Sequence, residues 1–188
     1  MANLQHIKGL DEFQRALQQL PQRIAKNVLR GAVRAGAVVL QQEAVHLAPE
    51  YEGGDEPDKR VDKGLIKRAI YSKQIPELSN EMQQTFYVGV RRGKKSTVKV
   101  KGQKVSVDAY YWTWLEFGHF YVPKQPAGTT QKKNREAHKT GPNAIWVEPR
   151  SFMRPAFAIA KDQAINAMVD YMERRIPIEA QKLGLMMK

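Results

Sequence analysis

VKVKGQKVSV, residues 98–107, is the clearest local pattern in the chain. Valine alternates with polar residues on both sides of Gly102 and Gln103, and a glycine at the first position of a two-residue loop suits a type II′ β-hairpin. The expected cross-strand pairs are Val100 with Val105 and Val98 with Val107. One face of the hairpin is then apolar and the other strongly cationic. Because an isolated two-stranded ribbon is marginal in water, we expect it to rest on further structure.

The segments around the hairpin indicate a small sheet. Residues 85–90 (TFYVGV) alternate between apolar and other side chains, which predicts a strand. Residues 64–70 (GLIKRAI) fit either a short helix or an extended segment that enters the sheet. Residues 110–117 (YYWTWLEF) are densely aromatic, and their periodicity does not decide between helix and strand.

Helices are predicted in the N-terminal region. An apolar stripe over residues 10–20 predicts a short helix that Pro21 ends, and a long helix follows up to about Ala48. In this long helix, Gly31 and Gly36 either allow another backbone to approach closely or are tolerated weaknesses of the helix.

A second long helix is predicted in the C-terminal region. Arg154 and Pro155 open it, because proline is tolerated in a first helical turn, and Pro177 should end or kink it. Its expected apolar face consists of Phe157, Ala160, Ala164, Ile165, Met168, Tyr171 and Met172. We therefore expect a single α+β domain over residues 1–188, with a small antiparallel sheet packed by a long N-terminal and a long C-terminal helix.

Two connecting segments have distinctive compositions. Residues 49–62 (PEYEGGDEPDKRVD) predict a loop and carry six acidic and two basic residues, a local charge of −4. Residues 119–149 form a polar connection with four prolines, which predicts a long loop. We interpret this loop and the basic hairpin, residues 91–108, as insertions in the domain.

Positive charge is concentrated in two places. The 188 residues include 31 Lys and Arg against 19 Asp and Glu, a net charge of +12, and residues 91–104 and 124–139 supply +7 and +4 of it. Such stretches are either solvated loops or surfaces for nucleic acid or an acidic protein. The basic residues of the hairpin region are Arg91, Arg92, Lys94, Lys95, Lys99, Lys101 and Lys104.

The composition excludes several classes of protein. The chain has no cysteine, which rules out disulfides, Cys-ligated zinc and thiol chemistry. No apolar run approaches the roughly 18–20 residues that span a bilayer, and the N-terminus lacks the apolar region of a signal peptide. We therefore expect a soluble protein of the cytosol.

Enzymatic motifs are missing from the sequence. No nucleotide-binding loop, zinc-protease motif or nucleophile elbow is present, and the four histidines His6, His46, His119 and His138 are dispersed. Glu116 and His119 are three residues apart, but Gly118 between them should break a helix, so a general-base pair is disfavoured. Asp55 and Asp58 sit beside two cations, which favours a solvated turn over a metal site. We predict no catalytic residue, no metal and no cofactor.

Sequence-independent DNA binding is the alternative function that the charges suggest. A basic hairpin can lie along a phosphate backbone, with a steep dependence on salt. Its cationic face has no interleaved aromatic residues, so it offers no platform for base stacking.

The order of these elements resembles a known family. The segments LEFG (115–118) and RSFMRPAF (150–157) carry the most specific part of the likeness. The chain resembles the tail-completion (neck, or head–tail joining) proteins of long-tailed bacteriophages, including the lambda minor tail protein Z group, over almost its whole length. The resemblance implies a structural virion protein with a fold like that of tail terminators, which forms a ring at the top of the tail tube and enables head–tail joining.

The resemblance also implies partners. These are other copies of the chain in a ring of six, a stopper or head-completion protein above and a tube or terminator protein below, and packaged DNA through weak non-specific contact. Assembly in the host cytoplasm would precede incorporation into the virion.

A ring needs two different patches that meet between neighbours. We expect the acidic segment 49–62 of one copy to approach the basic stretch 91–104 of the next. Two interpretations of Arg154 and Glu116 are open: separate capping or surface roles, or a direct pair within or between subunits. The candidate interface residues are Glu116, Phe117, Phe152, Arg154, Asp55, Glu56 and Asp58.

Overall fold

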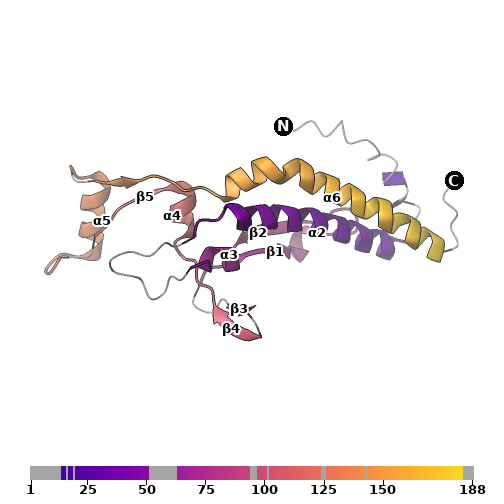
Figure 1. Ribbon diagram of the computed structural model, residues 1–188, viewed down its shortest axis with the longest axis horizontal. Coiled ribbons are helices and arrows are strands. Elements are labelled where there is room, and N and C mark those ends of the chain that lie inside the picture. The colour runs from indigo at the N-terminus through magenta and orange to yellow at the C-terminus, as the bar shows by residue number, and fades with distance from the viewer. Residues whose placement is uncertain are drawn as a thin grey trace. The chain divides into compact units, whose positions relative to one another are not determined.

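The computed structural model describes residues 14–183 except 16, 19, 51–62, 94–96, 101, 124–125 and 143. Figure 1 shows the helices and strands in this part of the chain. In chain order they are α2 (Gln22–Leu47), α3 (Leu65–Ala69), β1 (Ile70–Gln74), the 3-10 helix η2 (Pro76–Leu78), β2 (Phe86–Val90), β3 (Thr97–Val100), β4 (Gln103–Ser106), α4 (Trp112–Phe117), β5 (His119–Phe120), α5 (Gln131–Thr140), β6 (Trp146–Val147) and α6 (Met153–Lys182). The predicted α+β fold with two long helices is confirmed.

The described residues form two compact units. Unit 1 draws on residues 1–43, 72–89 and 159–188, and unit 2 on residues 44–71 and 90–158. Both α2 and α6 begin in one unit and end in the other. The interpretation of residues 1–188 as a single domain stays a prediction. Of the predicted first helix, residues 14, 15, 17 and 18 are described and are helical.

In unit 1, α2 and α6 lie side by side (Figure 1). Their shared core contains Val28 and Ala32 of α2 with Met172 and Ile176 of α6. The two glycines of α2 lie against α6: a Cβ at Gly31 would clash with the ring of Tyr171, and one at Gly36 would clash with Met168 and approach the carbonyl oxygen of Ala164 to 3.0 Å. Close packing is therefore the role of both glycines.

This packing gives a first testable expectation. Gly36→Leu should lower the free energy of unfolding by about 2 kcal/mol, because an overpacked helix contact costs more than the better helix propensity of leucine returns. Urea unfolding measures the change. Gln42→Leu, at an exposed position of the same helix, is the control and should leave the stability nearly unchanged. Equal effects at the two positions would contradict the close packing.

Strands β1 and β2 pair with each other in a sheet of two strands. The segment GLIKRAI, predicted as either a short helix or an extended segment, contains both. Helix α3 covers Leu65–Ala69, and β1 begins at Ile70. The strand predicted at 85–90 is β2. Backbone hydrogen bonds continue past the end of β2. The N–H of Arg91 donates to the carbonyl of Ala69, and the N–H of Ala109 donates to the carbonyl of Arg91.

The predicted hairpin forms, but its turn lies one residue earlier in the chain. Val98 pairs with Val105 and Val100 with Gln103, so Gly102 is the second residue of the loop, with a φ of 83°. The positive φ is a conformation that favours glycine. The new pairing keeps each side chain on its predicted face: Val107 is buried and Lys104 is exposed.

The segment 119–149 contains regular structure where the sequence predicted a long loop. Strands β5 and β6 pair antiparallel, with His119 opposite Val147 and Phe120 opposite Trp146, and helix α5 lies between them in the chain. The N-terminus of α5 is capped by Thr130, whose hydroxyl accepts the N–H of Lys133 at 3.3 Å. An almost wholly polar helix has no apolar periodicity, so the pattern could not reveal it.

Helix α6 also departs from its prediction at two residues. Pro177 lies inside it, and the helix continues to Lys182. Pro177 is exposed, so water can satisfy the carbonyl that loses its hydrogen-bond donor. Phe157, which was expected on the apolar face, is 61% exposed, whereas Ala160, Ala164 and Met172 are buried as expected.

Candidate functional site

The carboxylate of Glu116 lies at the N-terminus of α6. Its Oε2 accepts the backbone N–H groups of Phe152 at 2.8 Å and Met153 at 3.0 Å, and its Oε1 accepts that of Arg154 at 3.1 Å. These are N–H groups that a helix cannot satisfy within itself, and the positive end of the helix dipole favours a negative charge there. Glu116 is only 1% exposed, so this is a buried cap supplied from 36 residues away in the chain.

Arg154 completes the arrangement from the outer side. Its Nε donates to Oε1 of Glu116 at 3.1 Å, and its Nη2 donates to the Glu116 carbonyl at 2.7 Å and to the Ser151 hydroxyl at 2.9 Å. The Ser151 hydroxyl donates to the same carbonyl at 2.7 Å. The direct Glu116–Arg154 pair therefore forms within one chain, and Glu116 has the capping role as well.

The electrostatics of Glu116 follow from these contacts. Burial by itself raises the pKa of this carboxyl group, but the N–H groups of Phe152, Met153 and Arg154, together with the Arg154 guanidinium, outweigh burial and hold the pKa below its usual range. The carboxylate is thus charged at neutral pH and fully engaged. It is not available as a base for His119, whose ring instead stacks on Trp114 with 5.5 Å between the ring centroids.

Gly118 closes the LEFG segment in a conformation that only glycine adopts readily, with φ 75° and ψ 170°. A Cβ at this position would clash with the ring of Trp146 and lie 2.9 Å from the carbonyl oxygen of Val147. The backbone N–H of Arg150 donates to the carbonyl of Leu115 at 2.8 Å. Together with the Glu116 cap, these contacts hold LEFG against the segment that leads into α6.

The structure separates the predicted interface residues into two groups. Glu116 and Phe152 are buried within unit 2, because one caps α6 and the other is in the core. Phe117 and Arg154 are exposed by 57% and 61% and remain available to a partner. The Cζ atom of Arg154 lies over the ring of Phe117, 5.1 Å from the ring centroid. The three predicted acidic residues, Asp55, Glu56 and Asp58, lie outside the described residues.

The basic hairpin is only partly described. Arg91 lies over the ring of Tyr71, 4.3 Å from its centroid, and Arg92 and Lys104 are exposed. The backbone of Lys99 is part of β3, but its side chain is not among the described parts. The other predicted basic residues, Lys94, Lys95 and Lys101, lie outside the described residues. The part that can be described is therefore a ribbon with an apolar face on the core and an exposed lysine, Lys104.

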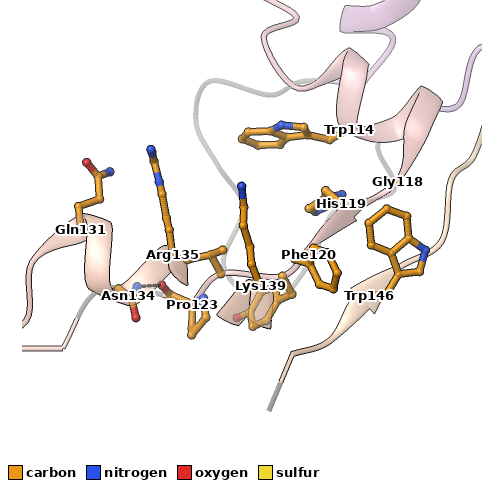
Figure 2. A pocket seen from close by; sticks show the side chains of 12 residues that line it. Trp114, Gly118, His119, Phe120, Pro123, Gln131, Asn134, Arg135, Lys139 and Trp146 are labelled. Carbon is orange, nitrogen blue, oxygen red and sulfur yellow. Dashed lines mark hydrogen bonds between the residues drawn. The ribbon is translucent and has the colours of Figure 1, made fainter. Parts of the chain in front are cut away.

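Sequence reasoning missed a cavity of about 770 Å³ beside the LEFG segment. Figure 2 shows its lining, which combines the aromatic rings of Trp114, His119 and Trp146 with the cationic side chains of Arg135 and Lys139. The i,i+4 spacing of the two cations in 131–140 could have indicated one basic helical face, had that segment been recognised as a helix.

The residues that the structure describes offer no metal centre, because no three His, Asp or Glu side chains among them could share an ion. In the same residues, no helix is both long and apolar enough to cross a membrane.

Comparison with known proteins identifies the family. The family model of HK97-gp10-like proteins, described as "Bacteriophage HK97-gp10, putative tail-component", matches residues 11–118. The match includes LEFG and ends before α5 and α6. Neither the curated proteins nor the solved structures contain a match to the chain. Since the matched residues make up more than half of the chain, the protein belongs to the HK97-gp10-like family of bacteriophage tail components.

Proposed function

We propose that this tail component forms a closed ring at the head–tail neck, at the top of the tail tube, and enables the head to join the tail. This is the role of tail-completion and tail-terminator proteins, including the lambda Z group. The partners would be further copies of the chain in a ring of six, with a stopper or head-completion ring on one side and a tube or terminator protein on the other. Assembly would take place in the host cytoplasm.

The observation that carries the proposal is the number of large apolar side chains that unit 2 exposes. They come from α4, from the β5–β6 ribbon and its flanks, and from the start of α6: Trp114, Phe117, Tyr121, Ile145, Trp146, Val147 and Phe157. Five of these seven side chains are aromatic, and aromatic residues are enriched where proteins meet. A structural tail component with such a surface is suited to association.

A ring also needs two different patches on each copy, and the charges of the chain offer them. The acidic segment 49–62 and the basic stretch 91–104 have opposite charges, and we retain as a proposal that they attract each other between neighbouring copies. Reversing the charges of Arg92 and Lys104, the exposed basic side chains at the hairpin, should then weaken assembly at low salt.

The mass of the purified full chain, alone and with tail tubes, tests the ring directly. Light scattering and negative-stain images should show a closed ring on the tube end. Phage that lacks the chain should accumulate separate heads and tails, which added protein should join. A chain that stays monomeric with tubes, or binds duplex DNA strongly at physiological salt instead, would overturn the proposal.

A pair of substitutions tests the apolar surface. Phe117→Ser with Phe157→Ser should weaken assembly at least tenfold, because it removes two exposed aromatic anchors of an interface. The melting temperature of the isolated chain should change little, since neither side chain is buried. Leu78→Ser, which alters an exposed apolar residue of unit 1, is the matched control and should leave assembly intact. Assembly that survives the double substitution would exclude this surface.

A further inference from the structure

The cavity beside LEFG has aromatic walls. Trp114 of α4 stacks on His119 of β5 with 5.5 Å between ring centroids, and Phe120 of β5 meets the ring of Trp146 of β6 edge to face at 5.0 Å. Aromatic rings provide large contact areas at little entropic cost and accept both apolar and backbone groups. The cavity therefore has the lining of a binding site for a chain segment.

Two cations complete the lining without a counter-charge. Arg135 and Lys139 are one turn apart in α5, and both extend from the helix toward the end of the cavity where Trp114 lies (Figure 2). Among the described residues neither of them has an ion-pair partner, and the cavity lining includes no acidic side chain. The ion pair that α5 does form joins Lys132 to Glu136 at 4.0 Å, away from the cavity. The two free cations indicate an anionic ligand.

Helix α5 holds these cations in place. Its N-terminus is capped by Thr130, and the side chain of Asn134, which is buried, donates to the carbonyl of Pro123 at 3.1 Å. Asn134 thus ties the middle of α5 to the chain that leaves β5. A site that is ordered before its ligand arrives binds more tightly, because less freedom is lost on binding.

We propose that this cavity binds the acidic segment 52–58 of a neighbouring copy of the chain. The segment, EGGDEPD, carries four carboxylates and no cation. Two cations one helical turn apart, about 5–6 Å, can each meet a carboxylate of an extended segment that rises about 3.3 Å per residue. Pro57 within the segment, and Tyr51 just before it, add apolar groups for the aromatic walls. The inference rests on the proposed self-assembly. In it the cavity, and not the basic stretch 91–104, is the site that binds the acidic segment of the neighbouring copy.

A synthetic peptide with the sequence of residues 50–58 tests the site without requiring a ring. Binding to the full chain should change the fluorescence of Trp114 and Trp146, which line the cavity. Arg135→Gln with Lys139→Gln should weaken binding at least tenfold. Lys132→Gln with Lys133→Gln removes the same charge from the same helix but not from the cavity, and should weaken binding less than twofold.

The outcomes of the peptide experiment are separable. Equal losses in the two double variants would mean non-specific attraction to a basic helix and would overturn the inference. A peptide in which Asn and Gln replace the acidic residues should not bind, and binding of that neutral peptide would likewise overturn it. If the acidic peptide does not bind while the chain still forms rings, the inference fails and the proposed function stands. If the peptide binds but the chain forms no ring, the proposed function fails and the binding site in the cavity stands.

Charge exchange between copies tests the neighbour directly. Copies with Arg135→Glu and Lys139→Glu, or with all four acidic residues of segment 52–58 replaced by Lys, should each fail to assemble, whereas an equal mixture of the two should assemble, because every interface between unlike copies restores opposite charges. A mixture that stays unassembled would show that the segment occupies the cavity of its own chain or lies elsewhere. Charge reversal at Arg92 and Lys104 distinguishes the two proposed sites for the acidic segment. Assembly that is lost with this variant, but kept when Arg135 and Lys139 are reversed, would assign the segment to the hairpin and overturn the inference.

Discussion

Replacing Glu116 by glutamine is expected to lower the free energy of unfolding by about 3 kcal/mol, because the buried N–H groups at the start of α6 lose a hydrogen-bond acceptor. The carboxylate accepts three backbone N–H groups and the Nε of Arg154 while it is only 1% exposed. An amide offers one acceptor atom and places an NH₂ group against donors that need an acceptor. Urea unfolding of the purified chain measures the loss.

The acid stability of the chain should change in the same variant. Because the folded-state pKa of Glu116 is lowered, its stabilisation is complete above the ordinary value of about 4.5 and is lost as pH falls through the lower folded-state value. The wild-type chain should therefore lose stability on acidification, and Glu116→Gln should lose less. Stability of the two proteins that falls in parallel with pH would contradict the role of this carboxylate.

Arg154 provides the matched control for Glu116. Its side chain is 61% exposed, so solvent screens its charge and can replace its hydrogen bonds. Arg154→Gln should cost only about 1 kcal/mol. A larger loss at Arg154 than at Glu116 would mean that the surface pair, and not the helix cap, holds LEFG against α6.

The sequence predicted the parts of the fold that local patterns determine. The valine alternation of 98–107 gave the hairpin and its apolar face, and the apolar stripes of the two long helices gave α2 and α6. The turn was misplaced because the valine alternation is unchanged when the loop moves by one residue, and a glycine with positive φ fits either loop position.

The candidate site was less accessible from the sequence. The pairing of Glu116 with Arg154 was one of two alternatives that the sequence left open, and the buried cap on α6 depends on backbone N–H groups, which leave no trace in side-chain patterns. Helix α5 is held by two polar contacts, the cap by Thr130 and the hydrogen bond from Asn134 to the carbonyl of Pro123. Neither contact produces the apolar periodicity by which a helix is recognised in a sequence. Without α5, the grouping of Arg135 and Lys139 with Trp114 could not be foreseen.

Gly118→Ala should destabilise the chain by about 3 kcal/mol, through two causes that add. With φ at 75° and ψ at 170°, any side chain at this position strains the backbone by about 1–3 kcal/mol. The new Cβ would also clash with the ring of Trp146 and lie 2.9 Å from the carbonyl oxygen of Val147, so the β5–β6 ribbon would have to move. Urea unfolding measures the stability, and the peptide titration reports whether the cavity that Gly118 and Trp146 line is still formed.

Gly128 separates the two causes. Its φ is 82°, but a Cβ there would meet nothing within 4 Å, so Gly128→Ala carries the backbone strain alone and should cost about 1 kcal/mol. The difference between the two substitutions then measures the contact with β6. Adding Trp146→Ala to Gly118→Ala removes the ring from that contact, and the two substitutions should be less costly together than the sum of their separate effects. Strict additivity, or equal losses at Gly118 and Gly128, would show that β6 does not pack on Gly118.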